Sequence, residues 1–241
     1  MKILDDLLST LRGDSVIKEV HSCAFWTAVV SRRCGLSSTF RGDHPHHGMV
    51  QDVGNLRGKP AIELAHYAKS DNMLEASIGM AAVNSMLDIN ESRCVTKNAL
   101  DILMEKGRGK NVVVVGHFPW VPTLKEVAGK FWVLEQRPQD GDLPAEAADD
   151  ILPQADVVAI TGTSFINHTM DGLLKLCRDS FIVLVGPTSP LTPVLFDWGI
   201  DVISGTIVDE PEITIRAISE GAIFRQVKGI RMVNMVKDGR R

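Results

Sequence analysis

A histidine, His117, follows directly on the apolar run VVVVG of residues 112–116. An imidazole titrates near neutral pH, so it can act as a general acid, a general base or a metal ligand. If the apolar run is a strand of a parallel sheet, His117 stands at the carboxyl end of that strand, where open α/β sheets bind their ligands. This position makes His117 the candidate proton-transfer residue.

Two further stretches, TGTS at 161–164 and GPTSP at 186–190, also follow apolar runs and supply hydroxyls and unhindered backbone N–H groups. Neither contains the lysine of a phosphate-binding P-loop. Both suit a neutral polar or modestly anionic ligand, although threonine and serine at such places also cap the helices that follow. The chain has no G-x-S-x-G motif, so the sequence gives no support to a hydrolase triad.

The loop after residue 116 lacks the G-x-G-x-x-G pattern of dinucleotide-binding proteins. Phe118, Pro119 and Trp120 stand where a pyrophosphate needs close approach of the backbone, which argues against ordinary NAD binding. Glu135 follows Gly116 by roughly the 20 residues that separate a glycine loop from a ribose-binding acid. An adenosine-like or other polyhydroxyl ligand therefore stays open as an alternative to a solvated acidic loop.

Three histidines, His44, His46 and His47, lie close together in GDHPHHG, with Asp43 beside them. Imidazole suits nickel, copper, zinc and iron, so this stretch is a candidate for a metal site. It also carries proline and glycine and is typical of an exposed loop, whereas metal ligands need neighbouring groups that orient them. A transition metal or metal complex is thus a candidate cofactor, and the sequence identifies neither the metal nor the reaction.

The composition is that of a soluble globular protein: 241 residues, 44% hydrophobic and 23% charged. A net charge of −4 and a pI near 6.0 argue against a nucleic-acid partner or an anionic membrane surface. The longest apolar runs, such as FIVLV at 181–185, are far shorter than a membrane-spanning helix. The acidic residues of the N-terminal segment are unlike a secretory signal, and no C-x-x-C pair occurs, so we expect a cytoplasmic protein with reduced thiols.

The first part of the chain predicts a small α+β unit over residues 1–70. Residues 16–40 are rich in β-branched and aromatic residues with a turn signal at 33–35, which indicates an antiparallel hairpin or meander. Pro60 opens a helical pattern that continues to about Ser70.

The remainder, residues 71–241, predicts a Rossmann-like parallel, doubly wound sheet. Residues 72–87 are apolar or small nearly all round, as in a buried helix, and residues 71–90 would link the two units. Continuous apolar strands then alternate with helical intervals such as 167–179, which is the pattern of an α/β fold. The predicted strands are 111–118, 131–136, 156–163, 181–188 and 201–208.

The motifs VGHFP, EQRPQDGDLPAEA, ADVVAITGTSFINHT and GPTSPLTPVLFDWGIDVISGTIV together resemble the "putative heavy-metal chelation" family, whose C-terminal domain is Rossmann-like. Residues 56–87 resemble its small domain, which has an enolase N-terminal-like fold. The resemblance implies an interdomain cleft that binds a metal complex or an organic chelator. The ligand-binding positions that it implies beside His117 are Phe118, Pro119, Arg137, Asp142, Thr161, Gly162, Thr163, Asn167, Gly186, Pro187 and Thr188.

Three functional hypotheses follow. The first is an enzyme acting on a small polar molecule tied to metal chelation, in which His117 transfers a proton and Arg137 clamps an anionic substituent. The second is a non-catalytic module that sequesters a metal or metal complex, with His117 or residues 44–47 as donors. The third is a nucleotide-dependent enzyme with a degenerate dinucleotide site that uses Glu135 for a ribose. The sequence leaves the ligand and the oligomeric state open.

Overall fold

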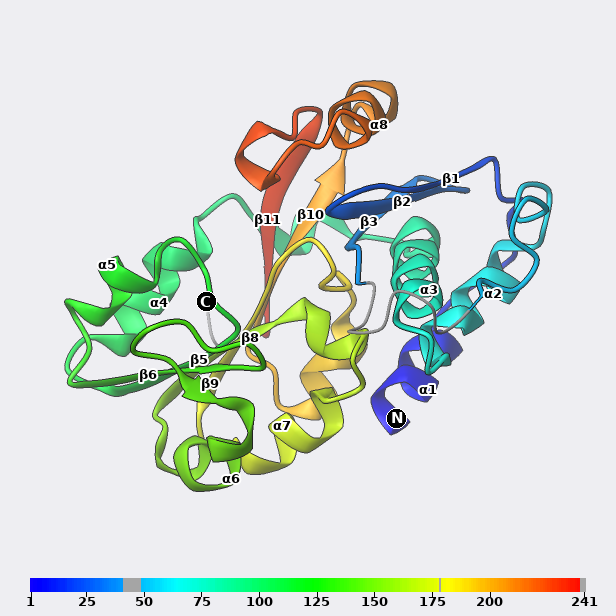
Figure 1. Cartoon of the computed structure of the whole chain (residues 1–241). Helices are drawn as coiled ribbons and strands as arrows, with labels where there is room; N and C mark the ends of the chain where they lie inside the picture. The colour runs from blue at the N-terminus through cyan, green and yellow to red at the C-terminus, as the bar shows by residue number, and fades with distance from the viewer. Residues whose placement is uncertain (41–48, 178, 239–241) are drawn as a thin grey trace.

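The computed structural model describes residues 1–40, 49–177 and 179–238 (Figure 1). Within these residues the strands form two sheets. One is a three-stranded sheet of order β1-β2-β3, and the other is an eight-stranded sheet of order β4-β11-β10-β9-β8-β5-β6-β7. The α/β class predicted from the sequence is confirmed.

The small sheet is an antiparallel meander of β1 (Glu19–Ser22), β2 (Trp26–Val30) and β3 (Cys34–Ser38), as the sequence predicts. The turn between β2 and β3 lies at residues 31–33, slightly before the predicted position. Gly35 is instead part of β3. The strand packs closely on a helix at this residue, since an added Cβ would lie 2.1 Å from a backbone oxygen of that helix.

Four helical segments accompany the small sheet: α1 (Lys2–Ser9), α2 (Ala61–Ala65), η1 (His66–Lys69) and α3 (Met73–Met86). Asn72 begins α3 by accepting the backbone N–H of Leu74 with its side chain at 3.0 Å. Most residues of α3 are buried, because the helix is covered by β2 and β3, by α2 and by η1. The prediction of a helix buried nearly all round is confirmed.

Each of the five strands predicted for the large sheet is present, and these five run parallel to one another. The sequence did not predict β11, which pairs antiparallel with β10, or the short strands β4 and β7 at the sheet edges. The strands are β4 (Cys94–Val95), β5 (Asn111–Val115), β6 (Lys130–Glu135), β7 (Leu143–Pro144), β8 (Val157–Thr161), β9 (Phe181–Val185), β10 (Val202–Val208) and β11 (Ile230–Val236).

Both faces of the large sheet are buried, which explains its continuous apolar strands. Val112 and Val114 of β5 belong to a cluster with residues of α4 (Ala99–Gly107) and α5 (Val121–Lys125). Val113 points to the opposite face and belongs to a larger cluster that α1, α3, α6 and α7 share. The remaining helices are η2 (Glu91–Arg93), η3 (Ala145–Ala147), α6 (Ala148–Ile151), η4 (Leu152–Gln154), η5 (Gly162–Phe165), α7 (Met170–Leu176), η6 (Pro193–Trp198), α8 (Pro211–Ser219) and η7 (Phe224–Gln226).

The helix predicted over 167–179 is shorter, since α7 begins at Met170. His168 has a positive φ of 60°, which no helix continues through, and its ring nitrogen Nε2 contacts the carbonyl oxygen of Ala68 at 3.0 Å.

The strand order places a topological switch point between β5 and β8. From β5 the chain passes through α5 on one face to β6, and then through α6 on the other face to β8 on the far side of β5. The chain leaves the carboxyl end of β5 toward α5 on one face and the carboxyl end of β8 toward α7 on the other face, so these two connections diverge between β5 and β8. In open α/β sheets such a divergence leaves the crevice where ligands bind.

The small sheet is joined to the large one at this same edge (Figure 1). The backbone N–H of Ser38 in β3 donates to Oγ1 of Thr188, which follows β9, at 2.9 Å. The side-chain amide of Asn84 in α3 donates to the carbonyl oxygen of Leu36 at 2.9 Å and lies 3.4 Å from that of Pro187. Within the described parts of the chain, no helix has the length and apolar character needed to cross a membrane.

Candidate functional site

A cavity of about 580 Å³ lies at the carboxyl ends of β8 and β9 and along the middle of β10, opposite β2 and β3 of the small sheet. We call it the large cavity. Trp26 and Ser38 contribute to its lining from the small sheet, so the cavity lies between the two sheets. The residues predicted to bind a ligand that line it are Phe118, Pro119, Thr161, Gly162, Thr163, Gly186, Pro187 and Thr188.

A second cavity of about 310 Å³, the small cavity, adjoins the first at the switch point. Phe118, Thr161 and Thr163 line both cavities and form the wall that they share. His117, Glu135 and Asn167 line the small cavity, so the predicted residues divide between two neighbouring spaces rather than one.

The imidazole of His117 is paired with a buried carboxylate. Its Nδ1 lies 2.9 Å from Oδ2 of Asp142, whose side chain is 4% exposed, while the histidine side chain is 29% exposed. The same carboxylate oxygen accepts the backbone N–H of Gln139 at 3.0 Å. A carboxylate on Nδ1 fixes the ring orientation and leaves Nε2 as the nitrogen for a ligand or a proton.

Glu135, at the end of β6, binds the backbone of three loop residues, the longest of these contacts being the N–H of Arg137 at 3.5 Å from Oε1. Its Oε2 accepts the N–H of His117 at 3.0 Å, and its Oε1 accepts the N–H of Gln136 at 2.7 Å. The acid therefore ties the loop after β5 to the end of β6 and holds the backbone of the histidine at the switch point.

The TGTS stretch after β8 forms η5, and Thr161 caps it: its Oγ1 accepts the N–H of Thr163 at 3.3 Å and lies 3.0 Å from the hydroxyl of that residue. The capping role that the sequence left open for these threonines is therefore present. Gly116 has a φ of 100°, and an added Cβ would lie 3.1 Å from Cβ of Thr161. Glycine thus lets the end of β5 pack closely against β8.

The other predicted residues serve different purposes. Thr188 is buried and accepts the N–H of Ser38, so its hydroxyl already joins the two sheets. Asn167 accepts the hydroxyl of Thr169 at 2.8 Å with its amide oxygen. Arg137 is exposed and lines neither cavity, so its side chain is not placed to clamp a ligand in them.

Two cations in the lining of the large cavity were missed by the sequence reasoning. Lys97 precedes α4, and Arg225 lies in η7, before the unpredicted strand β11. The Nζ of Lys97 lies 2.7 Å from Oε2 of Glu105, which holds the pKa of that carboxyl below its usual range. Neither cation follows a parallel strand, so the strand-end rule could not identify them.

Two aromatic pairs also line the large cavity. The rings of Phe118 and Trp120 are stacked with centroids 4.7 Å apart and an interplanar angle of 10°. Trp26 and Phe224 have centroids 5.5 Å apart at 52°. Aromatic pairs of this kind give a cavity flat apolar walls.

The described residues, 1–40, 49–177 and 179–238, contain no group of three His, Cys, Asp or Glu side chains that could hold a metal ion. His44, His46 and His47 lie outside the described residues. Burial raises the pKa of the Cys34 and Cys177 thiols to about 12, so both stay protonated at neutral pH. Because metals bind the thiolate, these two cysteines are poor ligands.

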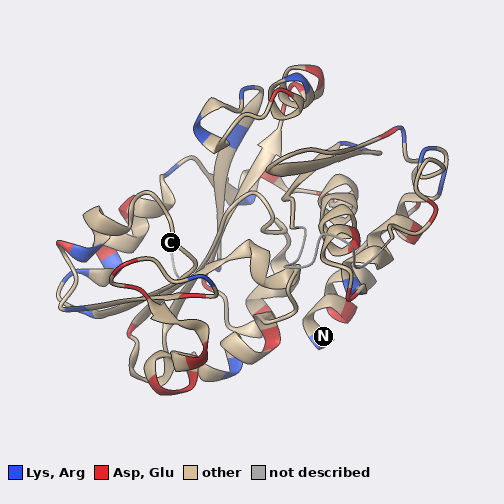
Figure 2. Ribbon diagram, in the orientation of Figure 1, with Lys and Arg blue, Asp and Glu red and all other residues tan. Residues whose placement is uncertain are grey.

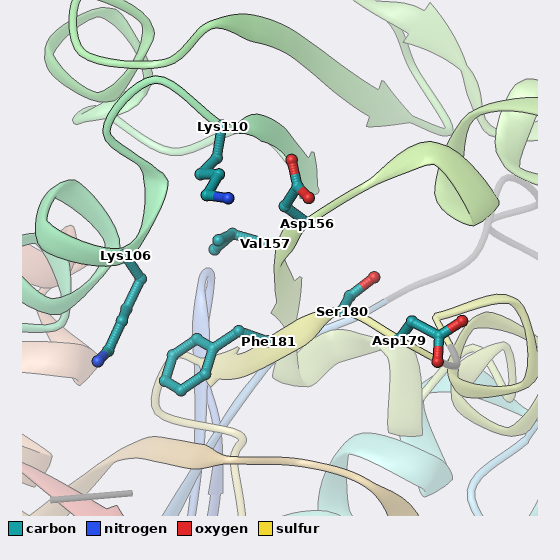
Figure 3. A pocket seen from close by; sticks show the side chains of 7 residues that line it. All are labelled: Lys106, Lys110, Asp156, Val157, Asp179, Ser180 and Phe181. Atoms are coloured by element: carbon teal, nitrogen blue, oxygen red, sulfur yellow. The ribbon is translucent and has the colours of Figure 1, made fainter.

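A cavity of about 300 Å³ at the opposite, amino-terminal edge of the sheet is shown in Figure 3. Three of its lining side chains already have partners within the chain. Asp156 accepts the N–H of Asn111 at 2.8 Å, Ser180 donates to a carbonyl oxygen at 2.7 Å, and Lys106 lies 5.5 Å from the ring centre of Phe181. It lies away from the switch point, so it is not the candidate site.

The arrangement defines a doubly wound α/β protein with a ligand-sized cavity between its parallel sheet and an antiparallel cap. Two family models match the chain, one at residues 4–87 and one at 98–237, and both carry the description "putative heavy-metal chelation". The model at residues 98–237, DUF364, spans more than half of the chain, so the chain belongs to this family; the model at 4–87 is DUF4213.

Two solved structures share the fold along nearly the whole chain, and a third protein is similar in sequence. A protein of unknown function from Desulfitobacterium hafniense, of the same family, is 30% identical with a TM-score of 0.85, and the match covers 98% of this chain and 97% of the other. A family member of unknown function from Pyrococcus horikoshii is 18% identical with a TM-score of 0.82, covering 98% of both. An uncharacterized protein of Methanocaldococcus jannaschii is 28% identical over 202 residues, 79% of this chain and 77% of its own.

Proposed function

We propose that this protein binds a small organic molecule in the large cavity, and that a metal, where one takes part, arrives as a complex of that molecule. The observation that carries the proposal is the lining of the cavity: aromatic rings, hydroxyls and two cations, with no carboxylate, imidazole or thiol among its described residues. A bare metal ion would find no suitable side-chain ligand there. A cavity of about 580 Å³ has the size of small-molecule sites.

Native mass spectrometry of the untagged full chain from its own host tests this proposal. We expect a retained organic mass. The variant Ser204→Phe places a ring in the large cavity from β10, where an aromatic residue suits a strand, and should lose that mass. The matched control Ala148→Phe places the same ring in the small cavity and should keep it. A stoichiometric bare metal with no organic mass, unaffected by Ser204→Phe, would refute the proposal.

The second candidate function is catalysis of a proton transfer on the bound molecule. The pairing of His117 with the nearly buried Asp142 favours it, because a carboxylate that orients an imidazole is a common device for general acid–base work. The wall of Phe118, Thr161 and Thr163 sets this pair next to the large cavity. His117→Asn should then retain the molecule of the large cavity but leave it unconverted, whereas equal conversion by the variant would exclude this role.

The nucleotide alternative loses its support. Both oxygens of Glu135 accept backbone N–H groups, so the hydroxyls of a ribose would have to compete with these backbone hydrogen bonds. The stacked rings of Phe118 and Trp120 occupy the region where a pyrophosphate would approach the backbone.

A further inference from the structure

The two aromatic pairs stand toward opposite sides of the large cavity. Phe118 and Trp120 follow β5, whereas Phe224 precedes β11 and makes a tilted ring contact with Trp26 of the small sheet. Because β8 and β9 lie between β5 and β10, the ends of β5 and β10 are about 14 Å apart at a strand spacing of about 4.8 Å. The floor between the pairs is formed by the carboxyl ends of β8 and β9 and by the middle of β10.

These walls are held in place by the rest of the fold. The indole Nε1–H of Trp26 donates to the carbonyl oxygen of Ala222 at 2.9 Å, which fixes the tryptophan ring beside η7. On the other side, Trp120 precedes α5 and stacks almost parallel to Phe118. Ring faces that are ordered before binding favour a flat, rigid guest, because little conformational freedom is lost when it enters.

The charge of the cavity has one sign. Lys97 and Arg225 are its charged lining residues, although the chain as a whole has a net charge of −4. Acidic positions gather elsewhere, notably on α6 (Figure 2). The lining also has neutral hydroxyls, such as those of Thr163, Ser204 and Thr206. These can form hydrogen bonds with ring substituents without repelling a negatively charged ligand.

Arg225 is the cation free to bind an anion. Lys97 is already paired with Glu105 at 2.7 Å, whereas the guanidinium of Arg225 has no ion pair or hydrogen bond within the described parts of the chain. A guanidinium presents its N–H groups in a planar fork that matches the oxygens of a carboxylate, sulfonate or phosphate. Its place in η7, next to Phe224, sets this fork beside one of the aromatic walls.

We propose that the ligand of the large cavity is a flat aromatic anion, whose ring packs against the aromatic walls and whose acidic group binds Arg225. This inference rests on the proposed function and gives its ligand a chemical class. Under this proposal the cavity would bind a metal as its complex with an aromatic, negatively charged chelator, in preference to a free cation.

A pair of fluorescent dyes with the same rings tests the proposal on the full chain. Anilinonaphthalene sulfonate carries a negative charge, and its parent phenylnaphthylamine is neutral. We expect saturable binding of one sulfonate dye per chain, about tenfold tighter or more than the neutral dye at physiological ionic strength. Ser204→Phe should abolish the binding of both dyes, since it fills the space between the walls.

A second variant tests whether the charge of Arg225 causes the preference for the anionic dye. Arg225→Gln keeps a polar hydrogen-bonding side chain but removes the charge, and should bring the affinity for the sulfonate dye down to that of the neutral dye. Arg216→Gln is the matched control, since Arg216 is an exposed arginine of α8 outside the large cavity, and it should leave the preference unchanged. Equal affinity of the wild type for both dyes, or a preference that survives Arg225→Gln, overturns the claim of an anion site.

Failure of this inference is distinguishable from failure of the proposed function. If Ser204→Phe removes the retained host molecule but neither dye binds the emptied wild-type cavity, the cavity binds a ligand that is not an aromatic anion. If nickel or copper ions alone bind the wild type and this binding is lost in Ser204→Phe, both proposals fail.

Discussion

A single methyl group in helix α3 should destabilise the protein substantially. Gly79 of α3 crosses η1 so closely that an added Cβ would lie 1.9 Å from the backbone N of Ala68 and 2.6 Å from its Cα. Both neighbours are backbone atoms, so no side-chain rotation relieves the overlap. The helix must instead move away from η1 by roughly 1.5 Å to restore a normal contact of about 3.5 Å.

Overpacking of this kind costs typically about 1–3 kcal/mol or more. The change to alanine recovers about 1 kcal/mol of helix propensity. Because the overlap is with backbone atoms, the upper end of about 3 kcal/mol applies, and for Gly79→Ala we expect a net loss of about 2 kcal/mol in the free energy of unfolding. In a chain of this size that loss lowers Tm by roughly 4–8 °C.

The assay is urea and thermal unfolding followed by circular dichroism, with Gly172→Ala as the matched control. Gly172 is also a helical glycine, in α7, but no atom lies within 4 Å of its added Cβ. The control should be stabilised by up to about 1 kcal/mol. A Gly79→Ala variant as stable as the wild type, or shifts of the same sign in both variants, would refute the close packing of α3 on η1.

Three further results are expected. Thr188→Val removes the acceptor of a backbone N–H from β3, so urea unfolding should show a decrease of about 1–3 kcal/mol in the free energy of unfolding. An unchanged free energy of unfolding would mean that this hydrogen bond does not join the sheets. Arg231 lowers the pKa of Asp209, so the wild type should be more stable than Asp209→Asn at neutral pH, and this difference should disappear as the pH falls below 3.8 through the lowered pKa. Because the pair is exposed, the difference should be less than about 1 kcal/mol. A difference that persists in acid contradicts the pairing. Cys34 and Cys177 should resist iodoacetamide in the native protein and react only on unfolding, and rapid native labelling seen by mass spectrometry would contradict their burial.

The strands of the large sheet were predictable because burial on both faces demands continuous apolar residues. Val112, Val113 and Val114 illustrate this, since they alternate between two apolar clusters. The last strand was missed because Arg231 and Asn234 interrupt its apolar run. Asn234 occupies a buried position there, and its side chain donates to the carbonyl oxygen of Lys97, a contact that only the folded chain creates.

The candidate site was predictable in part for a physical reason. Residues that follow parallel strands gather at one edge, so the loops after β5, β8 and β9 could be assigned to a common region. The sequence could not show that Phe118, Thr161 and Thr163 divide this region into two cavities.

The contributions of Trp26 and Arg225 could not be predicted either. They reach the large cavity from the small sheet and from η7, and their positions depend on how these parts pack rather than on any local pattern. Asp142 could be predicted in part. The family resemblance included it as a ligand-binding position, but its contact with His117 is visible only in the folded chain.

The most direct test of the central claim is a crystal structure of the full chain isolated from its own host without added metal. We expect electron density for a planar molecule in the large cavity, packed against the aromatic rings, with an acidic group within hydrogen-bonding distance of Arg225. A metal ion bound directly by protein side chains, in a crystal whose large cavity holds only water, would contradict the account.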